Sequence, residues 1–323
     1  MKTRASSPAS RKRWPKSAPD SAVIDTLVVT GVGLIGGSFA LALKQAGRVR
    51  HVIGVGRGRA NLEQALALGL IDEIAEVARD AYARADFILV ATPVGQMARV
   101  FAELVPVLKA EAVVSDAGST KCDVVALARA AFGSRIGQFV PAHPIAGAEL
   151  NGATAARAGL YRGKKLVIAA LPETAPDAVA RVEAAWRVCG ARVFAMAPEL
   201  HDRTFAAVSH LPHVLAFALV DEIARKPHAD TLFQFAASGF RDFTRIAGGS
   251  PEMWRDIALA NRSALLTEID EYMARLAAVR GMIDVGDASA LDAVFSNARD
   301  ARQAWLDSIE AGEEAAPGAA RNA

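Results

Sequence analysis

The chain has 323 residues, of which 52% are hydrophobic and 22% are charged, with a net charge of +2. This length suggests about two domains, and the apolar content is sufficient for buried cores. The sequence contains no uninterrupted apolar run of about 18 residues and no apolar N-terminal stretch, which argues against a transmembrane helix and a secretory signal and favours a cytoplasmic protein.

Residues 1–21 form a basic segment, with six Lys or Arg against one Asp within the first 20 positions. A segment of this kind either contacts an anionic surface or is a disordered leader. Because the remainder of the chain is net negative and continues no basic surface, we predict a disordered arm and neither a nucleic-acid nor a membrane partner. Residues 313–323, rich in Ala, Gly and Glu, are likewise predicted to be a disordered tail. Cys122 and Cys189 are predicted to be reduced thiols.

A glycine-rich segment follows an apolar strand predicted at 23–29 and opens an apolar helix predicted at 39–46. In this strand-turn-helix context Gly31 permits the tight turn, Gly33 lets a pyrophosphate approach the backbone, and Gly36 lets the helix pack on the strand. The segment therefore predicts a dinucleotide site at the N-terminus of a helix. Three further residues complete the predicted cofactor-binding set: Leu34, Ile35 and Thr92.

The end of the second predicted strand, 51–56, bears on which dinucleotide binds, because an acidic residue there would hold a ribose 2'-hydroxyl. The sequence instead has Arg57 and Arg59, and no acidic residue before Glu63. Guanidinium groups pair with a 2'-phosphate, so the pattern favours NADP over NAD. The alternative is that both arginines only solvate a surface loop.

Apolar runs and helical patterns alternate up to residue 197, which predicts a Rossmann-like, doubly wound α/β domain over 22–197. From residue 198 to 312 only helical periodicity remains, which predicts an all-helical second domain. The further expected strands are 87–91, 112–115, 137–141, 165–170 and 192–195. The expected helices are 94–108, 121–131, 176–190, 198–226, 251–281 and 288–310.

Polar residues follow two of these strands, where an α/β sheet presents a substrate site. Ser119, in DAGSTK at 116–121, is either a helix N-cap or a hydroxyl beside the nicotinamide, and residue type alone favours the cap. His143, in HPIAG at 143–147, is expected at the carboxyl edge of the sheet. A histidine at this place is able to take a hydroxyl proton near neutral pH.

Two further clusters lie in the helical region. In SHLPH at 209–213, Pro212 is expected to kink a long helix and aim His213 into the cleft, while His210 is expected to pack in the core. Zinc binding by these two histidines and His201 lacks a further ligand at a characteristic spacing, so no metal is predicted. The segment 239–245 is expected to join two helices, and its arginines either grip a carboxylate or hold the domains together.

These motifs together resemble the prephenate/arogenate dehydrogenase family over about residues 23–281. The resemblance rests on six motifs in order: the glycine run, DAGSTK (116–121), HPIAG (143–147), SHLPH (209–213), GFRDFTRIA (239–247) and MWRDIALAN (253–261). It implies a nucleotide-binding α/β domain followed by a helical dimerisation domain, hence a homodimer, with the active site between the domains.

The resemblance also implies oxidative decarboxylation of prephenate or arogenate, in which hydride passes to NAD(P) and the ring becomes aromatic, as a step of tyrosine biosynthesis. His143 would accept the hydrogen bond or proton of the 4-hydroxyl, and Ser119 would orient that hydroxyl and the nicotinamide. Arg245 would bind a substrate carboxylate and His213 the side-chain end of the substrate. Two acidic residues would belong to a polar network that gates the cleft: Glu149 and Asp242.

Two alternatives stay open at this point. A β-hydroxyacid-type dehydrogenase shares the domain order but resembles families with a lysine on the long helix, and this chain has no lysine after Lys226. A non-catalytic dinucleotide-sensing regulator would not need Ser119, His143 and Arg245 to converge on one small anion. The sequence shows neither a C-terminal regulatory domain nor an N-terminal mutase domain, so we expect a monofunctional chain. It leaves the choice between prephenate and arogenate open.

Overall fold

The computed structural model describes residues 23–147 and 150–314, with side chains described up to residue 309. The predicted basic arm, Glu149 and most of the predicted C-terminal tail lie outside the described residues. The chain divides after Asn261 into two compact units.

The first unit is built around a six-stranded sheet in the order β3-β2-β1-β4-β5-β6, in which every pairing is parallel. This is the strand order of a dinucleotide-binding fold, with β1 beside β4 at the point where the order reverses. The strands are β1 (Ile24–Thr30), β2 (Val49–Val55), β3 (Glu73–Ile74), β4 (Phe87–Val90), β5 (Val113–Asp116) and β6 (Phe139–Val140). The connecting helices are α1 (Leu34–Gln45), α2 (Arg59–Ala67), α3 (Ala78–Arg84), η1 (Val94–Gln96), α4 (Met97–Leu104), η2 (Val105–Val107), α5 (Cys122–Phe132) and η3 (Gly133–Gln138).

A second sheet of three strands follows, in the order β7-β8-β9. Strand β7 runs antiparallel to β8, and β8 runs parallel to β9. The strands are β7 (Ala142–Ile145), β8 (Lys165–Ile168) and β9 (Arg192–Ala195), with η4 (Ala153–Ala155) and α6 (Pro176–Val188) between them. Only Pro141 separates β6 from β7, so the chain passes from one sheet to the other within a single residue.

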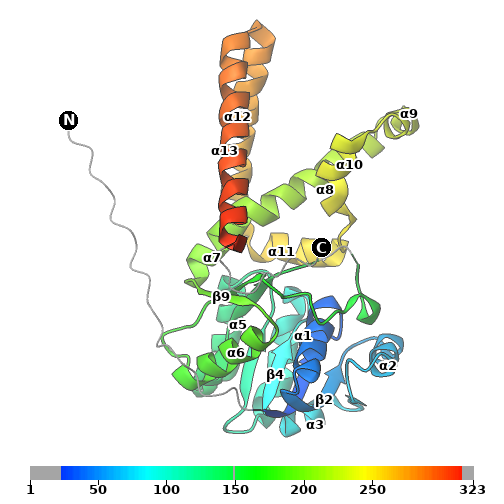
Figure 1. Ribbon diagram of the computed structural model, residues 1–323, viewed down its shortest axis with the longest axis vertical. Helices are drawn as coiled ribbons and strands as arrows, with labels where there is room; N and C mark the ends of the chain where they lie inside the picture. Colours follow the sequence, from blue (N-terminus) through cyan, green and yellow to red (C-terminus); the bar gives the residue numbers. More distant parts are fainter. Residues whose placement is uncertain (1–22, 148–149, 315–323) are drawn as a thin grey trace, which may run out of the picture. The chain divides into compact units, whose positions relative to one another are not determined.

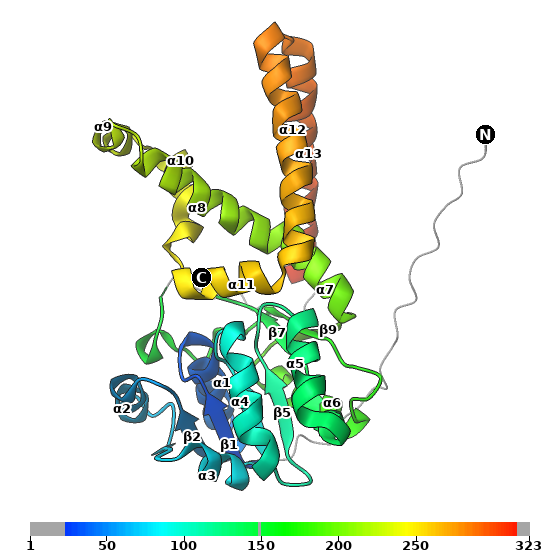
Figure 2. The same cartoon turned by 180° about the vertical axis from the view of Figure 1, so that it is seen from behind.

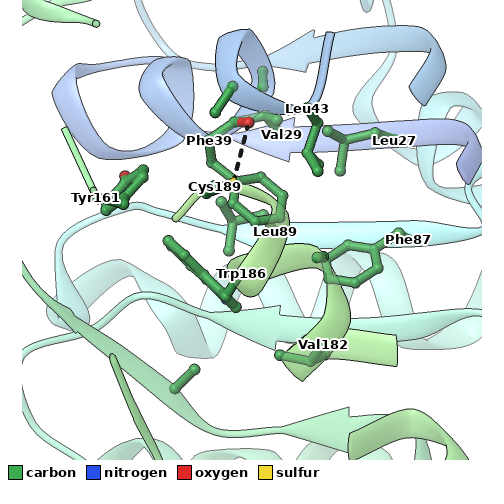
Figure 3. Close-up of a cluster of buried hydrophobic side chains, with 14 of the residues drawn as sticks. Leu27, Val29, Phe39, Leu43, Phe87, Leu89, Tyr161, Val182, Trp186 and Cys189 are labelled. Atoms are coloured by element: carbon green, nitrogen blue, oxygen red, sulfur yellow. Dashed lines mark hydrogen bonds between the residues drawn. The ribbon is translucent and has the colours of Figure 1, made fainter. Parts of the chain in front are cut away.

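Two apolar clusters cover the two faces of the large sheet, because successive residues of a strand point to opposite sides. On one face Trp186 of α6 packs on Phe39 of α1 and on Tyr161, with ring centroids 4.6 and 4.9 Å apart (Figure 3). The Cys189 Sγ lies 4.0 Å from the Phe39 carbonyl oxygen in the same cluster. On the other face three phenylalanine rings pack together: Phe101, Phe132 and Phe139. Each fully buried side chain of this size stabilises the fold by roughly 1.5–3 kcal/mol.

The rest of the first unit is helical (Figures 1 and 2). Its elements are α7 (Pro198–Phe205), a π-helical turn η5 (Ala206–His210), α8 (Leu211–Ala224), α9 (Ala229–Gln234), α10 (Ser238–Thr244), η6 (Arg245–Gly248) and α11 (Pro251–Ala260). Pro212 lies in the first turn of α8, directly after the π-helical turn. Proline has no N–H to donate, and a π-helical turn is a common place for such an interruption of the helical hydrogen bonds.

The stretch Pro198–Ala224 is long and apolar enough, by length and composition, to cross a membrane, with a mean hydropathy of 1.3. It nevertheless buries three polar side chains: His201, Asp202 and His210. Asp202 accepts hydrogen bonds from the backbone of Lys121 and Cys122 in the α/β part. The first turns of this stretch are therefore packed against the α/β part.

The second unit contains α12 (Arg262–Val285) and α13 (Ala288–Glu314), which pack as a helical pair (Figure 1). Gly286 forms the turn between them with φ +68°, a conformation that favours glycine. The Asp287 carboxylate accepts a hydrogen bond from the Ala290 N–H at 2.9 Å and so caps the start of α13.

The predicted Rossmann-like sheet followed by helices is confirmed, and the following details differ from the expectation. Helix α1 begins at Leu34, five residues before the predicted start, because the glycines themselves lie in its first turns. The predicted helix 251–281 is interrupted at Asn261, and the predicted helix 198–226 contains the π-helical turn. The segment predicted to join two helices at 239–245 is itself mostly helical, as α10.

Candidate active site

The glycine loop between β1 and α1 has the geometry that its sequence predicts. Gly31 has φ +94°, and a Cβ there would lie 2.6 Å from the Ala91 carbonyl oxygen. A Cβ on Gly36 would lie 2.3 Å from the Gly31 carbonyl oxygen, so helix and loop meet too closely for a side chain. A Cβ on Gly33 meets nothing within 4 Å, so the backbone faces open space there. The glycines thus divide into two that pack the protein and one that leaves room for a ligand.

The surroundings of Gly33 fit the phosphates of a dinucleotide. Gly33 is the N-cap of α1, the first turn of the helix carries no acidic residue, and the exposed N–H groups at this end attract anions. The Ile35 carbonyl is held by the Tyr161 hydroxyl at 2.6 Å. Beyond β4, the Thr92 Oγ1 is buried without a hydrogen-bond partner among the described residues, as expected of a group that awaits a ligand.

The structure separates the two arginines predicted to recognise a 2'-phosphate. Arg59 lies at the first position of α2, where its guanidinium donates to Glu63 at 3.0 Å and to Glu76 at 2.9 Å. Arg57 lies in the loop after β2, with its side chain 63% exposed and 3.5 Å from the Glu252 carboxylate. Arg57 is therefore the less constrained of the two.

Asp116, at the end of β5, holds the Ser119 loop and the His143 strand together. One carboxylate oxygen accepts from the Gly118 N–H at 2.7 Å, and the other accepts from the Ala142 N–H at 3.0 Å. The buried ammonium of Lys121 pairs with the same carboxylate. Since Ser119 follows Gly118 and His143 follows Ala142, one side chain positions both predicted catalytic residues.

Ser119 is not a helix cap. The N-cap residue of α5 is Lys121, and no side chain of this segment makes a capping hydrogen bond. The backbone N–H groups at the start of α5 are instead satisfied by Asp202, whose two oxygens accept from Lys121 and Cys122 at 2.8 Å each. The half-buried Ser119 hydroxyl is therefore not needed to cap the helix.

His143 lies within β7 rather than in a loop at the edge of the large sheet, and its position opposite Val167 fixes the backbone. Its Nδ1 lies 2.8 Å from the Nε2 of His201 on α7, and the Nδ1 of His201 lies 2.8 Å from the Asp202 carboxylate. The Phe205 ring packs against both imidazoles, with centroids 5.0 and 4.5 Å away. Among the described residues the Nε2 of His143 has no protein hydrogen-bond partner.

Burial and hydrogen bonding determine the protonation states of His143, His201 and Asp202. Burial lowers the pKa of His143 well below 6.5, and the neighbouring His201 lowers it further. Burial likewise lowers the pKa of His201, against an opposing effect of its hydrogen bond to Asp202. Burial alone would raise the pKa of Asp202, but hydrogen bonds from His201 and from the α5 backbone bring it below its ordinary value. At neutral pH the two imidazoles are neutral and the carboxylate is ionised.

A second pair of histidines continues the site along η5 and α8. His213 stacks on Trp254 of α11 with ring centroids 3.6 Å apart, and its Nδ1 bonds to the Ser209 carbonyl at 2.8 Å. His210 is 1% exposed, and its Nδ1 lies 3.1 Å from the Asn261 amide nitrogen. The buried Nε2 of His210 has no hydrogen-bond partner among the described residues, although the Ser119 backbone lies beside the ring.

The residues predicted to bind the substrate carboxylates lie on α10 and η6, which pack beside α8. Arg245 begins η6, and its side chain is exposed. Asp242, on α10, is exposed as well, and the Nε of Arg241 lies 4.0 Å from its carboxylate. Glu149, predicted as a partner of this group, falls outside the described residues.

Sequence reasoning missed several residues of the site: Asp116, Lys121, His201, Asp202, Trp254 and Asn261. It weighed His201 only as a zinc ligand and Asn261 only for the alternative dehydrogenase. In the described part of the chain, no three His, Cys, Asp or Glu side chains cluster to hold a metal ion. The adjacent pair His-Asp at 201–202 was the available signal, but its partner lies 58 positions earlier in the chain.

A parallel α/β fold with a dinucleotide-binding glycine loop and a buried, neutral histidine is typical of nicotinamide-dependent dehydrogenases. Comparisons with known proteins identify which one. The sequence model of the prephenate dehydrogenase nucleotide-binding domain matches residues 39–195, and that of the prephenate dehydrogenase dimerization domain matches residues 197–297. The chain belongs to the prephenate dehydrogenase family.

Individual relatives agree with this assignment. The chain is 36% identical to the prephenate dehydrogenase of Bacillus subtilis (strain 168), over 86% of this chain and 75% of the relative. It is 33% identical to the cyclohexadienyl dehydrogenase of Zymomonas mobilis, over 87% of this chain and 96% of the relative.

Solved structures give the same result. The Aquifex aeolicus prephenate dehydrogenase in complex with hydroxyphenyl propionate and NAD+ superposes with a TM-score of 0.82 at 33% identity, covering 88% of this chain and 99% of that one. The Synechocystis arogenate dehydrogenase superposes with a TM-score of 0.71 at 28% identity, covering 87% and 99%. Family membership favours the dehydrogenase over both alternatives.

Proposed function

We propose that this enzyme oxidatively decarboxylates prephenate, arogenate or both, to 4-hydroxyphenylpyruvate or tyrosine, as a step of tyrosine biosynthesis. The observation that carries the proposal is His143, a neutral imidazole whose Nδ1 is held by His201 while its Nε2 has no partner among the described residues. The relatives named prephenate, cyclohexadienyl and arogenate dehydrogenase support the same substrate class.

In this proposal His143 and Ser119 act on the ring hydroxyl. A bound nicotinamide dinucleotide supplies the hydride acceptor. His143 Nε2 takes the hydroxyl proton as the C4–O bond gains carbonyl character, and returns it when loss of carbon dioxide makes the ring aromatic. Ser119 orients the hydroxyl. Asp116 accepts hydrogen bonds from the backbone next to each of these two residues and so fixes their relative positions. A fixed geometry of the reacting groups favours proton transfer.

The glycine loop and its neighbours hold the cofactor in this proposal: Gly31, Gly33, Leu34, Ile35, Gly36 and Thr92. We favour NADP over NAD because the segment that follows β2 offers Arg57 and has no acidic residue before Glu63. Arg57→Gln then raises the KM for NADP by about 10- to 100-fold, the value of a charge-assisted hydrogen bond, and leaves the KM for NAD unchanged. Arg59→Gln is the matched control with a smaller effect, since two glutamates already hold Arg59. An unchanged ratio of NADP to NAD efficiency in Arg57→Gln would assign the arginine to the surface.

On the substrate side we propose that Arg245 binds a carboxylate and that His213, fixed by its stack on Trp254, contacts the side-chain end of the substrate. We assign Glu149 and Asp242 to a polar network that gates the cleft.

We further propose that residues 22–197 bind the cofactor and that residues 198–312 bind the substrate and form the dimer. The dimerization-domain match at 197–297 supports a homodimer, and we place the enzyme in the cytoplasm.

The direct test of this chemistry is the variant His143→Asn. We expect kcat to fall by about 10²- to 10⁴-fold with little change in KM, because the amide cannot take the proton. The dinucleotide affinity should match that of the wild type. His228→Asn, which changes an exposed histidine, is the control. A near-normal kcat of His143→Asn would remove His143 from the mechanism.

A further inference from the structure

Three side chains from two elements form one continuous hydrogen-bonded chain behind the reacting face of His143. The His143 Nδ1, on β7, is 2.8 Å from the His201 Nε2, on α7. The His201 Nδ1 is 2.8 Å from the Asp202 Oδ1. His201 is 0% exposed and Asp202 is 5% exposed, so water does not substitute for either contact.

The protons along this chain have only one consistent arrangement. An ionised carboxylate only accepts hydrogen bonds, so the His201 Nδ1 must carry a proton. Because His201 is neutral at neutral pH, its Nε2 then carries none and must accept from the Nδ1–H of His143. A neutral His143 that is protonated on Nδ1 has an unprotonated Nε2.

Building on the role of His143 proposed above, we propose that His201 and Asp202 are positioning residues that hold His143 in the Nδ1–H tautomer and leave its Nε2 free as the proton acceptor. When Nε2 takes the substrate proton, the resulting imidazolium keeps donating its Nδ1–H to His201, and the Asp202 carboxylate offsets the charge. No proton needs to travel beyond His143.

The far end of the chain is anchored on a helix N-terminus. The Asp202 carboxylate accepts from the Lys121 and Cys122 N–H groups at the start of α5, at 2.8 Å each. The positive end of the helix dipole favours an ionised carboxylate. The Asn261 amide donates to the Asp202 carbonyl at 2.7 Å and fixes the backbone of α7 at the same point. The carboxylate is therefore held ionised and in place, which the tautomer argument requires.

The other charged or titratable groups near these imidazoles do not offer a competing acceptor. Lys121 is buried and paired with Asp116 from β5. His210, on η5, faces Asn261, and burial lowers its pKa to about 4. Cys122 is a protonated thiol, since burial raises its pKa to about 12. Asp202 is thus the carboxylate that decides the tautomer of His201.

Nitrogen-15 spectra of the full-length enzyme labelled in histidine test the proposal without turnover. Long-range proton–nitrogen correlations distinguish the two neutral tautomers, and the variants His143→Asn and His201→Asn assign the signals. We expect His143 and His201 both to carry the proton on Nδ1 at neutral pH. An Nε2–H tautomer of His143 would overturn the proposal, even if the enzyme turns over prephenate as proposed above.

The variant Asp202→Asn tests the cause. Its amide keeps one acceptor oxygen for the three donors that face the carboxylate, namely the Lys121 N–H, the Cys122 N–H and the His201 Nδ1–H. When that oxygen takes the Cys122 N–H, the amide nitrogen donates to the His201 Nδ1, which moves the His201 proton to Nε2 and forces His143 into the Nε2–H tautomer. We expect the spectrum to show this switch and kcat to fall by about 10²- to 10⁴-fold with KM changed less than about threefold. Arg203→Gln, an exposed neighbour on α7, is the control.

An unchanged His143 tautomer together with an unchanged kcat in Asp202→Asn would refute the positioning role. If Asp202→Asn does not fold, the wild-type spectrum alone decides the question. Full turnover by His143→Asn, by contrast, would refute the proposed role of His143 itself and leave the measured tautomers intact.

Discussion

Acid should weaken the fold through His210, and the size of the effect follows from its pKa. Burial lowers the pKa of this imidazole from 6.5 to about 4. The folded chain keeps His210 neutral while the unfolded chain protonates it, so its contribution is complete above about pH 6.5 and is lost as the pH falls toward about 4. At about 1.36 kcal/mol per pKa unit, the free energy of unfolding drops by about 2 kcal/mol at about pH 5 and by about 3 kcal/mol at about pH 4.

Urea unfolding of the wild type and of His210→Asn measures this loss at one fixed protein concentration between about pH 7.5 and about pH 4. The introduced amide oxygen can accept from Asn261 in place of the imidazole Nδ1, so the local hydrogen bond is kept. The stability advantage of the wild type over the variant should shrink by about 3 kcal/mol across this range. The exposed-histidine variant His228→Asn is the control. Parallel curves for the wild type and His210→Asn would refute the reasoning.

Two further predictions concern binding. Gly36→Ala should lower the melting temperature and abolish dinucleotide binding, because its Cβ would meet the Gly31 carbonyl oxygen at 2.3 Å. Gly33→Ala should keep the melting temperature and weaken only dinucleotide binding, since its Cβ meets no protein atom; equal loss of stability in both variants would contradict this division. Arg245→Gln should raise the KM for the substrate by about 10- to 100-fold with a smaller change in kcat, and an unchanged KM would show that Arg245 binds something else.

Much of the α/β part is predictable because its strands are buried on both faces and read as short apolar runs. β1, β2, β4 and β5 all have this pattern. Two strands that sequence reasoning missed are of a different kind. β3 spans two residues, too few for a periodic signal, and β7 contains Pro144, a residue that normally argues against a strand. β7 tolerates this proline because it lies at the edge of the small sheet.

The candidate site is predictable where a residue follows a strand and not where the tertiary fold brings helices to it. Ser119 and His143 stand out because ligands of an open α/β sheet bind beyond the carboxyl ends of its strands, where these two residues are expected. His201 and Asp202 lie on an ordinary amphipathic helix, and only the packing of α7 on α5 gives them their role. The helix break at Asn261 is likewise absent from the local periodicity: the backbone leaves the helical conformation there, at φ −97° and ψ +30°, and the side-chain amide donates to the Asp202 carbonyl.

The most direct test of the central claim is turnover by the purified full-length protein. Reduction of the nicotinamide is followed by its absorbance, with prephenate and arogenate each combined with NAD and NADP, and kcat/KM is compared for the four pairs. We predict turnover with at least one of the two substrates, and higher efficiency with NADP than with NAD. No turnover in any pair by a protein that still binds the dinucleotide would contradict the proposed function.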